Sequence, residues 1–350
     1  MDNTIVISTP PHVKSKRTTR GIMIDVCIAL SPAAIAGCVF FGWQALLIIL
    51  ISVFTCAATE FIYFFIANGG FSNKCRDAGA VCKRFVRQFD FTSVVTGLIL
   101  ALILPTTDKW WQVFYEVIFG AIFSIAVVKM FFGGTGKNLV NPAAAGRAFM
   151  FLSFGLTTYV AANFGPVMDG SEVLTGATNL SGSILMGNGN VLNLVDLLLG
   201  TGKAGCIGET CIIAILIGYV YLCARGVIKW WQPLLFFVIL GFTAVIMNGF
   251  YGETYVFDMN AFLPAILSGG AAFAGVFMLT DYVTSPKGVW GQTFYYGFAA
   301  ILLGVLRYFT KIEVASFIIL IMNIITPLID RYMIEKPFGY KKEKKQKESN

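Results

Sequence analysis

Long apolar runs, each separated from the next by a shorter polar stretch, fill most of the chain. A helix needs about 20 mostly apolar residues to cross a bilayer. Ten stretches come close enough to this requirement to be predicted as spans: 21–41, 43–68, 91–106, 110–132, 138–160, 205–224, 231–250, 259–280, 290–308 and 313–330. The pattern therefore predicts an all-α polytopic membrane protein with about ten transmembrane helices.

An aromatic pattern, Trp-x-Gln-x-Phe-Tyr, opens the fourth predicted span at Trp110 and the ninth at Trp290. Because five spans separate the two copies, the two halves would have opposite orientations. Such inverted repeats are typical of transporter folds with broken helices, and the eighth span contains Pro264 and a glycine break at 268–270. Chance recurrence of one short aromatic pattern is the alternative.

The repeat divides the chain into five regions. These are an N-terminal arm (1–20), a first five-helix repeat (21–160), a long loop (161–204), a second five-helix repeat (205–330) and a basic tail (331–350).

Composition agrees with a lipid environment, since 57% of the residues are apolar and only 13% are charged. Positive charge favours the cytoplasmic side of a membrane. Lys and Arg gather in the arm, in the loop after the second span, after the sixth span and in the tail, so both termini are expected in the cytoplasm. The 161–204 loop is then extracytoplasmic. Arg307 and Lys311 are exceptions to this distribution.

The single histidine, His12, lies in the polar arm. A membrane haem usually takes imidazole ligands at bilayer depth, so haem binding is not expected. The lysines of the tail suit a solvated cytoplasmic end, and we expect no nucleic-acid binding.

The 161–204 loop is too polar to span and long for a connector, and long ordered loops are usually functional. It contains Glu172-Val-Leu-Thr175-Gly176-Ala177-Thr178. This run resembles the flavinylation signature Asp-x-x-Ser/Thr-Gly-Ala-Thr, which a flavin transferase reads. The resemblance implies a flavin mononucleotide (FMN) esterified through its phosphate to Thr178. Glu172 departs from the usual aspartate, and a plain turn is the alternative interpretation.

Three further segments resemble one family, the D subunit of the Rnf complex and its homologue, the B subunit of the Na⁺-translocating NADH:quinone reductase. They are FGGTGKNLVNPAAAGR (132–147), LGTGKAGCIGET (199–210) and the run from 267 to 286, which ends in TDYVTSP. The resemblance covers residues 20–335, and the chain length favours the D subunit. Tyr282 replaces a proline that the family usually shows.

This resemblance implies a second flavin, a non-covalent riboflavin held within the helix bundle by Asn138, Asn141 and Asp281. The chemistry of Asn138 and Asn141 partly supports a flavin site, because amide side chains offer both donors and acceptors to the polar edge of an isoalloxazine. The two asparagines are three residues apart, which predicts one helical face. A pair of helix-capping asparagines beside glycine-rich turns is the alternative.

Ionisable residues at membrane depth are functional candidates by default. Glu209, Glu116, Glu60 and Asp25 are therefore candidates for an ion path. Glu209 follows a glycine-rich entry to the sixth span, where an acidic residue in the first helical turn would also interact with the helix dipole.

The resemblance implies an electron-carrying subunit of an ion-translocating ferredoxin:NAD oxidoreductase in the bacterial cytoplasmic (inner) membrane, working with other subunits and matured by a flavin transferase. No nicotinamide fingerprint or set of cluster ligands occurs, so the chain is not expected to catalyse the reaction alone. The alternatives are a B-type quinone-reductase subunit, a solute transporter without a redox role and a purely structural anchor.

Overall fold

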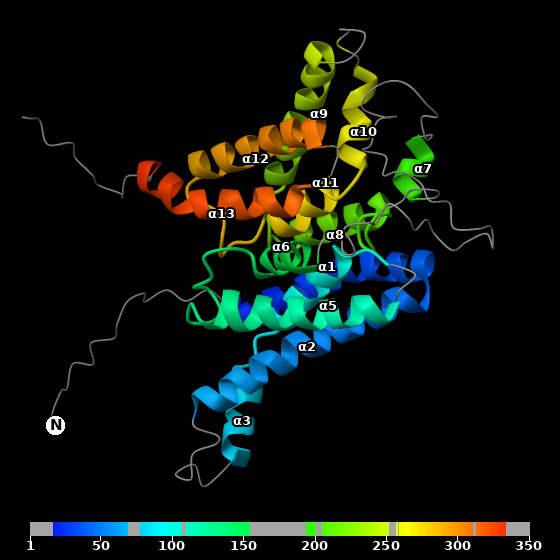
Figure 1. Cartoon of the computed structure of the whole chain (residues 1–350). Coiled ribbons are helices and arrows are strands. Elements are labelled where there is room, and N and C mark those ends of the chain that lie inside the picture. The colour runs from blue at the N-terminus through cyan, green and yellow to red at the C-terminus, as the bar shows by residue number, and fades with distance from the viewer. Residues whose placement is uncertain are drawn as a thin grey trace, which may run out of the picture.

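A computed structural model describes residues 17–68, 78–106, 110–154, 194–200, 205–251, 257, 259–310 and 313–333. All regular elements within these ranges are helices (Figure 1). The flavinylation signature, 172–178, falls outside them, as do the N-terminal arm up to residue 16 and the tail from 334.

The first half of the chain forms six elements: α1 (Thr19–Phe41), α2 (Trp43–Ala67), α3 (Ala78–Gln88), α4 (Thr92–Leu102), α5 (Trp110–Ile122) with its continuation η1 (Phe123–Met130), and α6 (Pro142–Phe154). The continuation η1 is a π-helix, a rare form that is frequent at functional sites. A short helix, α7 (Leu194–Leu199), precedes the second half.

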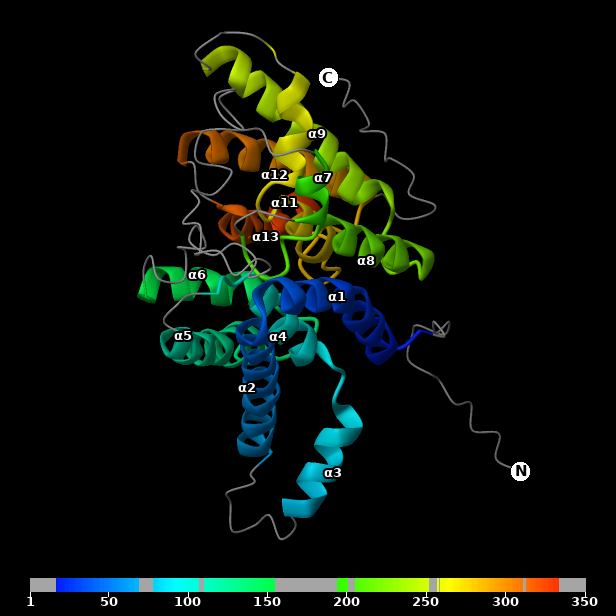
Figure 2. The same ribbon diagram turned by 90° about the vertical axis from the view of Figure 1, so that its right-hand side faces the viewer.

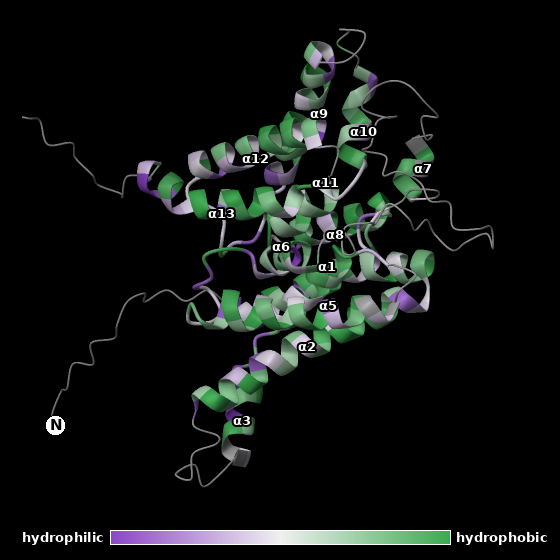
Figure 3. Cartoon of the chain, in the orientation of Figure 1, coloured by the Kyte–Doolittle hydropathy of each residue, from purple (hydrophilic) through white to green (hydrophobic). Residues whose placement is uncertain are grey.

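The second half repeats this order with α8 (Ile212–Ala224), α9 (Trp231–Tyr251), η4 (Met259–Ala261) with α10 (Phe262–Leu267), α11 (Ala271–Phe273) with η5 (Ala274–Met278), α12 (Val289–Thr310) and α13 (Ala315–Tyr332). Hydrophobic residues predominate along these helices (Figure 3). Many of their large apolar side chains are exposed, as expected for a surface in contact with lipid.

In the part of the chain that the structure describes, six helices are long and apolar enough to cross a membrane, or up to eight if each of two bent pairs counts as one span. The prediction of a multi-pass, all-helical membrane protein is confirmed, but the count of ten spans is not reached. The predicted spans 138–160 and 205–224 correspond to α6 and α8, which have 13 residues each among the described residues.

In each half a sharp bend separates the third and fourth helical elements. The helices Val81–Gln88 and Thr92–Leu102 meet at 65°, and Met259–Leu267 and Ala271–Met278 meet at 70°. The glycine break at 268–270 marks the second bend, as the sequence indicated. The first bend, at 89–91, was not expected. Phe91 there has a φ of 65°, a left-handed conformation rare for a bulky residue.

The two halves meet through equivalent elements. The first helices of the halves, α1 and α8, pack together, and so do the last, α6 and α13. Figures 1 and 2 both place α1–α5 on one side and α9–α13 on the other, with α6 and α8 between them. Pairing of first with first and last with last is the arrangement expected when the contact lies on a two-fold axis between the halves.

Arg307, an exception to the predicted charge distribution, is buried within α12. Its guanidinium forms an ion pair with Glu313 and donates to the carbonyl of Ala265, 3.1 Å away. Glu313 also accepts from the backbone N–H of Gly270 at 3.0 Å. The charge of Arg307 therefore holds the bend between α10 and α11, and it is not a loop charge that would bear on orientation.

The contact between α2 and α4 depends on Gly97. A Cβ added there would lie 2.8 Å from Val53 Cα, so the backbones would have to separate. We expect Gly97→Ala to destabilise the chain by about 1–3 kcal/mol through overpacking, measured as a lower midpoint of thermal unfolding in detergent. Gly79→Ala in α3 is the matched control, because nothing lies within 4 Å of its added Cβ. Equal midpoints for the two variants would contradict this interpretation.

Candidate functional site

The glycine-rich loop between η1 and α6 brings Asn138 and Asn141 to the interface between the halves. Gly133, Gly134 and Gly136 have φ values of 106°, 87° and 86°, a region open mainly to glycine. These turns reverse the chain after η1 so that α6 begins at Pro142. The prediction that both asparagines share one helical face is wrong, because both precede the helix.

Asn141 caps α6, as the alternative interpretation had it. Its side-chain oxygen accepts from the N–H groups of Ala143 at 3.0 Å and Ala144 at 3.3 Å, which satisfies two donors of the first helical turn. Its amide nitrogen donates to the carbonyl of Met278 in the second half, 3.5 Å away. Asn141 therefore ties the start of α6 to the end of η5.

Asn138 does not act as a cap. Its side-chain oxygen is buried and has no hydrogen-bond partner. An unsatisfied buried acceptor costs about 1–3 kcal/mol, and such a group calls for an explanation. A bound ligand that donates a hydrogen bond would remove this cost.

Asp281 lies in the loop that follows η5. One carboxylate oxygen accepts from the N–H of Val283 at 3.1 Å, and the other accepts from the hydroxyl of Thr284 at 3.2 Å. Burial raises the pKa of Asp281 above its ordinary value, although these two hydrogen bonds act in the opposite direction. The carboxyl is thus fixed in position within a poorly hydrated setting.

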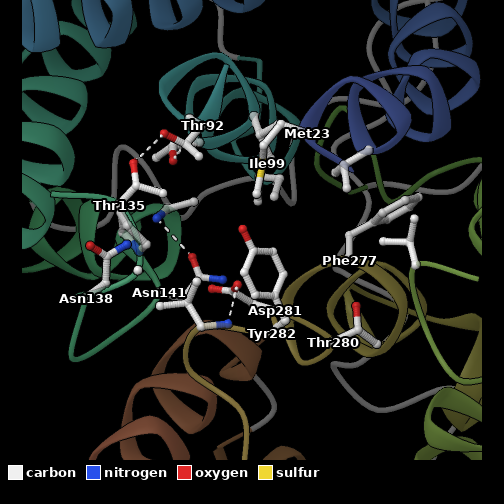
Figure 4. A pocket seen from close by; sticks show the side chains of 18 of the residues that line it. Met23, Thr92, Ile99, Thr135, Asn138, Asn141, Phe277, Thr280, Asp281 and Tyr282 are labelled. Atoms are coloured by element: carbon white, nitrogen blue, oxygen red, sulfur yellow. Dashed lines mark hydrogen bonds between the residues drawn. The ribbon is translucent and has the colours of Figure 1, made fainter. Parts of the chain in front are cut away.

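These three residues line one pocket between the halves (Figure 4). Its cavity volume is about 100 Å³, within about 830 Å³ of empty space that includes an open mouth. Figure 4 shows the ring of Tyr282 directed into the pocket, with Thr92 and Thr135 across from Asp281. Most of the remaining lining is apolar: Met23, Val26, Val95, Ile99, Leu222, Val227, Ile228 and Phe277. The pocket therefore combines an apolar slot with a few polar groups, as ligand sites commonly do.

The chain is similar to known proteins over nearly its whole length. The model of the NQR2, RnfD, RnfE family matches residues 6–339. The chain belongs to this family. It is 35% identical to the D subunit of the Na⁺-translocating ferredoxin:NAD⁺ oxidoreductase complex of Acetobacterium woodii, over 98% of each chain.

Two further members of the NQR2, RnfD, RnfE family show a similarity of the same extent. The D subunit of the proton-translocating ferredoxin:NAD⁺ oxidoreductase complex of Clostridium ljungdahlii is 31% identical, over 96% of this chain and 97% of its own. The D subunit of the ion-translocating oxidoreductase complex of Escherichia fergusonii is 28% identical, over 96% and 99%. The family resemblance predicted from the sequence is confirmed.

The four acidic candidates for an ion path do not converge in this family member. Asp25 lies near one end of α1, where it accepts from Arg225 at 3.1 Å and from the hydroxyl of Tyr221 at 3.2 Å. Glu116 is fully buried within α5. The other two candidates, Glu209 and Glu60, each form an ion pair with a buried basic residue.

Glu209 lies 3.5 Å from the guanidinium of Arg147, and both side chains are buried. The expectation that Glu209 occupies the first turn of a helix is wrong, because α8 begins at Ile212. Glu209 belongs instead to the non-helical segment before α8, whose N–H groups at Ile207 and Gly208 donate to carbonyls of the α4 end at 3.0 and 2.7 Å.

Glu60 pairs with Lys129 at 2.8 Å. Sequence reasoning singled out acidic residues and missed both basic partners, Lys129 and Arg147. The signal was present, because each lies within a predicted span, and a basic residue at membrane depth is as much a functional candidate as an acidic one.

Proposed function

We propose that this chain is an electron-carrying subunit of an ion-translocating ferredoxin:NAD⁺ oxidoreductase complex, with one flavin on the extracytoplasmic loop and a second within the helix bundle. The supporting observation is the similarity over nearly the whole chain to proteins named as the D subunits of such complexes. Other subunits of that complex are its partners. The relatives' names differ in the ion, Na⁺ or proton, so the coupling ion stays open.

The first flavin is a covalent FMN on Thr178, within the extracytoplasmic loop. Support comes from the Thr175-Gly176-Ala177-Thr178 run and from Glu172 at the position of the signature's aspartate. Small residues before the acceptor threonine allow close approach by a flavin transferase. The ester would retain the cofactor outside the cytoplasm, where a free flavin would diffuse away.

The second flavin is a riboflavin in the pocket of Asn138, Asn141 and Asp281. The residues fit this group, because the partnerless oxygen of Asn138 offers an acceptor to the ring N–H, and the apolar lining suits the ring faces. The closed cavity holds a few waters rather than three fused rings, so the flavin would extend into the open mouth. Asn141 is committed to the helix cap, and its part is to hold the pocket wall.

When bound, an isoalloxazine accepts and releases one or two electrons. The chain's own residues would orient it. Asn138 would accept a hydrogen bond at the polar edge, while Val95, Ile99 and Phe277 would exclude water from the ring faces. Asp281, fixed by Val283 and Thr284, would place a carboxyl beside the same edge.

Asn138→Ala is expected to lower the amount of riboflavin that acid extraction releases from the purified protein by at least tenfold. The variant loses the partnerless oxygen, while the α6 cap at Asn141 is kept, so folding should be retained. Chromatography of the extract measures riboflavin, and in-gel fluorescence of the same sample measures covalent FMN, which should be unchanged. Full riboflavin content in Asn138→Ala would remove Asn138 from the site.

The alternative of a solute transporter without a redox role makes a different prediction. Inverted repeats and broken helices occur in transporters as well, so the fold does not separate the two functions. A transporter would carry no flavin of either kind. A denaturing gel under ultraviolet light, together with the acid extract, decides between them.

A further inference from the structure

Helix α3 lies at the edge of the bundle, beside the end of α2. Figures 1 and 2 both show α3 projecting away from the other helices. One side of α3 packs on α2, because Val81 is only 7% exposed and the ring centre of Phe85 lies 5.1 Å from that of Phe61 and 5.4 Å from that of Phe64. α3 is therefore held through one face, and the residues of the opposite face are exposed.

The exposed face of α3 is strongly basic. Lys83, Arg84 and Arg87 are exposed, and none of them forms an ion pair with a residue that the structure describes. The neighbouring sequence does not balance this charge, because residues 74–87 contain five basic residues and one acidic residue, a net charge of +4. Like charges three or four residues apart on a helix repel each other. Bound anions would remove this repulsion, so the face is suited to an anionic ligand.

An apolar flank borders this basic face. Val86 is 68% exposed. Successive residues of a helix are rotated by about 100°, which places Val86 and Cys82 between the side that packs on α2 and the side that carries Lys83. A helix with a basic face and an apolar flank typically lies in the interfacial layer of a membrane, with its apolar part toward the acyl chains. The exposed valine thus favours a lipid over a soluble anion.

The bend at 89–91 places α3 at the level of the lipid headgroups. α4 is apolar and most of its residues are buried in the bundle, and α3 leaves it at 65°. Lysine and arginine are costly at bilayer depth, so the change from apolar α4 to basic α3 marks the point where the chain reaches the membrane surface. Arg20, exposed at the start of α1, has its guanidinium 5.2 Å from the ring centre of Phe91. A further cation therefore lies at the same level.

We propose that the exposed face of α3 binds the phosphate groups of anionic phospholipids. Clusters of basic residues next to a membrane span are attracted to anionic lipid. Lys83 and Arg87 are one helical turn apart, so both can approach one headgroup, and the arginine can donate to its phosphate through a planar fork. Val86 meets the acyl chains. Because three residues connect α3 to Thr92 at the start of α4, the bound lipid also holds the first bend in place.

Hydrogen–deuterium exchange of the full-length chain tests this site. The protein is placed in nanodiscs of phosphatidylcholine alone, or of phosphatidylcholine mixed equally with phosphatidylglycerol. Binding stabilises α3 against local opening, and each basic residue near an anionic surface strengthens the attraction by about fivefold. We therefore expect exchange in peptides covering 78–91 to be at least about fivefold slower with phosphatidylglycerol, and this difference should shrink at high salt because salt screens exposed charges.

Lys83→Gln/Arg87→Gln should show the same exchange in both kinds of nanodisc. Lys137→Gln/Arg331→Gln is the matched control. It removes the same charge from two exposed residues outside α3, and it should keep the wild-type difference. If the α3 variant does not fold, the two lipid compositions and the salt dependence of the wild type decide by themselves.

Equal exchange of the wild type in both kinds of nanodisc would overturn the proposal, and so would a lipid difference that persists in Lys83→Gln/Arg87→Gln. Inorganic phosphate added to phosphatidylcholine nanodiscs should have no effect. If it slowed exchange as much as phosphatidylglycerol does, the face would bind a soluble anion and not a lipid. None of these readouts requires a flavin, so failure here is distinguishable from failure of the flavin assignments.

Discussion

Thr178→Val is expected to abolish covalently bound flavin and to stop electron transfer through the intact complex. Valine has nearly the shape of threonine but lacks the hydroxyl oxygen that would carry the phosphate ester. Removing a cofactor from a chain of redox centres interrupts the chain, so the loss should be at least a hundredfold rather than partial. In-gel fluorescence and the mass of the peptide covering 161–203 report attachment. Ferredoxin-dependent NAD⁺ reduction by membranes reports electron transfer.

Ser181→Ala is the matched control for this variant. It removes a hydroxyl three residues further along the same loop, outside the signature, and should leave both readouts unchanged. Glu172→Asp restores the usual acidic residue of the signature and should also retain full attachment. A fluorescent Thr178→Val protein would show that the flavin is attached elsewhere. A dark protein with normal electron transfer would favour a structural anchor.

The helical elements were largely predictable because burial in lipid leaves a local signal in the sequence. The predicted span 43–68 corresponds to α2 (Trp43–Ala67), and 231–250 corresponds to α9 (Trp231–Tyr251). The break at 268–270 was predictable for the same reason, because the glycines that cause it are visible in the local sequence. The bend at 89–91 and the π-helix η1 were not predictable. Glu60 pairs with Lys129 of η1, and Arg20 lies over the ring of Phe91 at the bend, and the sequence does not show that these residues are adjacent.

That Asn138, Asn141 and Asp281 line one pocket was predictable only through resemblance. Asn138 and Asp281 are more than a hundred residues apart, and nothing in their spacing indicates that they line one pocket. Local geometry then separates the two asparagines, since one caps a helix and the other keeps a partnerless oxygen. Sequence reasoning had treated them as equivalent. The difference arises because the glycine turns place the start of α6 at Pro142, so only Asn141 reaches the exposed N–H groups.

Arg147→Met is expected to destabilise the protein by about 3–5 kcal/mol, because it leaves the carboxylate of Glu209 buried without its charged partner. Arg147 belongs to α6, Glu209 to the segment before α8, and Ser316 to α13. The guanidinium lies 3.5 Å from Glu209 and 3.5 Å from the hydroxyl of Ser316. One side chain thus joins three elements at the interface of the halves. Its loss should loosen that interface and not one helix alone.

Thermal unfolding in detergent and a second substitution test this view. In Arg147→Met/Glu209→Gln the unpaired charge is removed, so most of the lost stability should return, as a double-mutant cycle would report. Arg225→Met at the Asp25 pair is the control. The Arg225 side chain is 57% exposed and solvent screens its charge, and Asp25 keeps the hydroxyl of Tyr221 as a partner, so the midpoint should fall much less than in Arg147→Met. Gly270 lies against Glu209, where an added Cβ would come within 2.3 Å of its carboxylate. Gly270→Ala should therefore disturb the same interface. If Arg147→Met/Glu209→Gln is no more stable than Arg147→Met, then the packing of the arginine, and not its charge, holds the halves together.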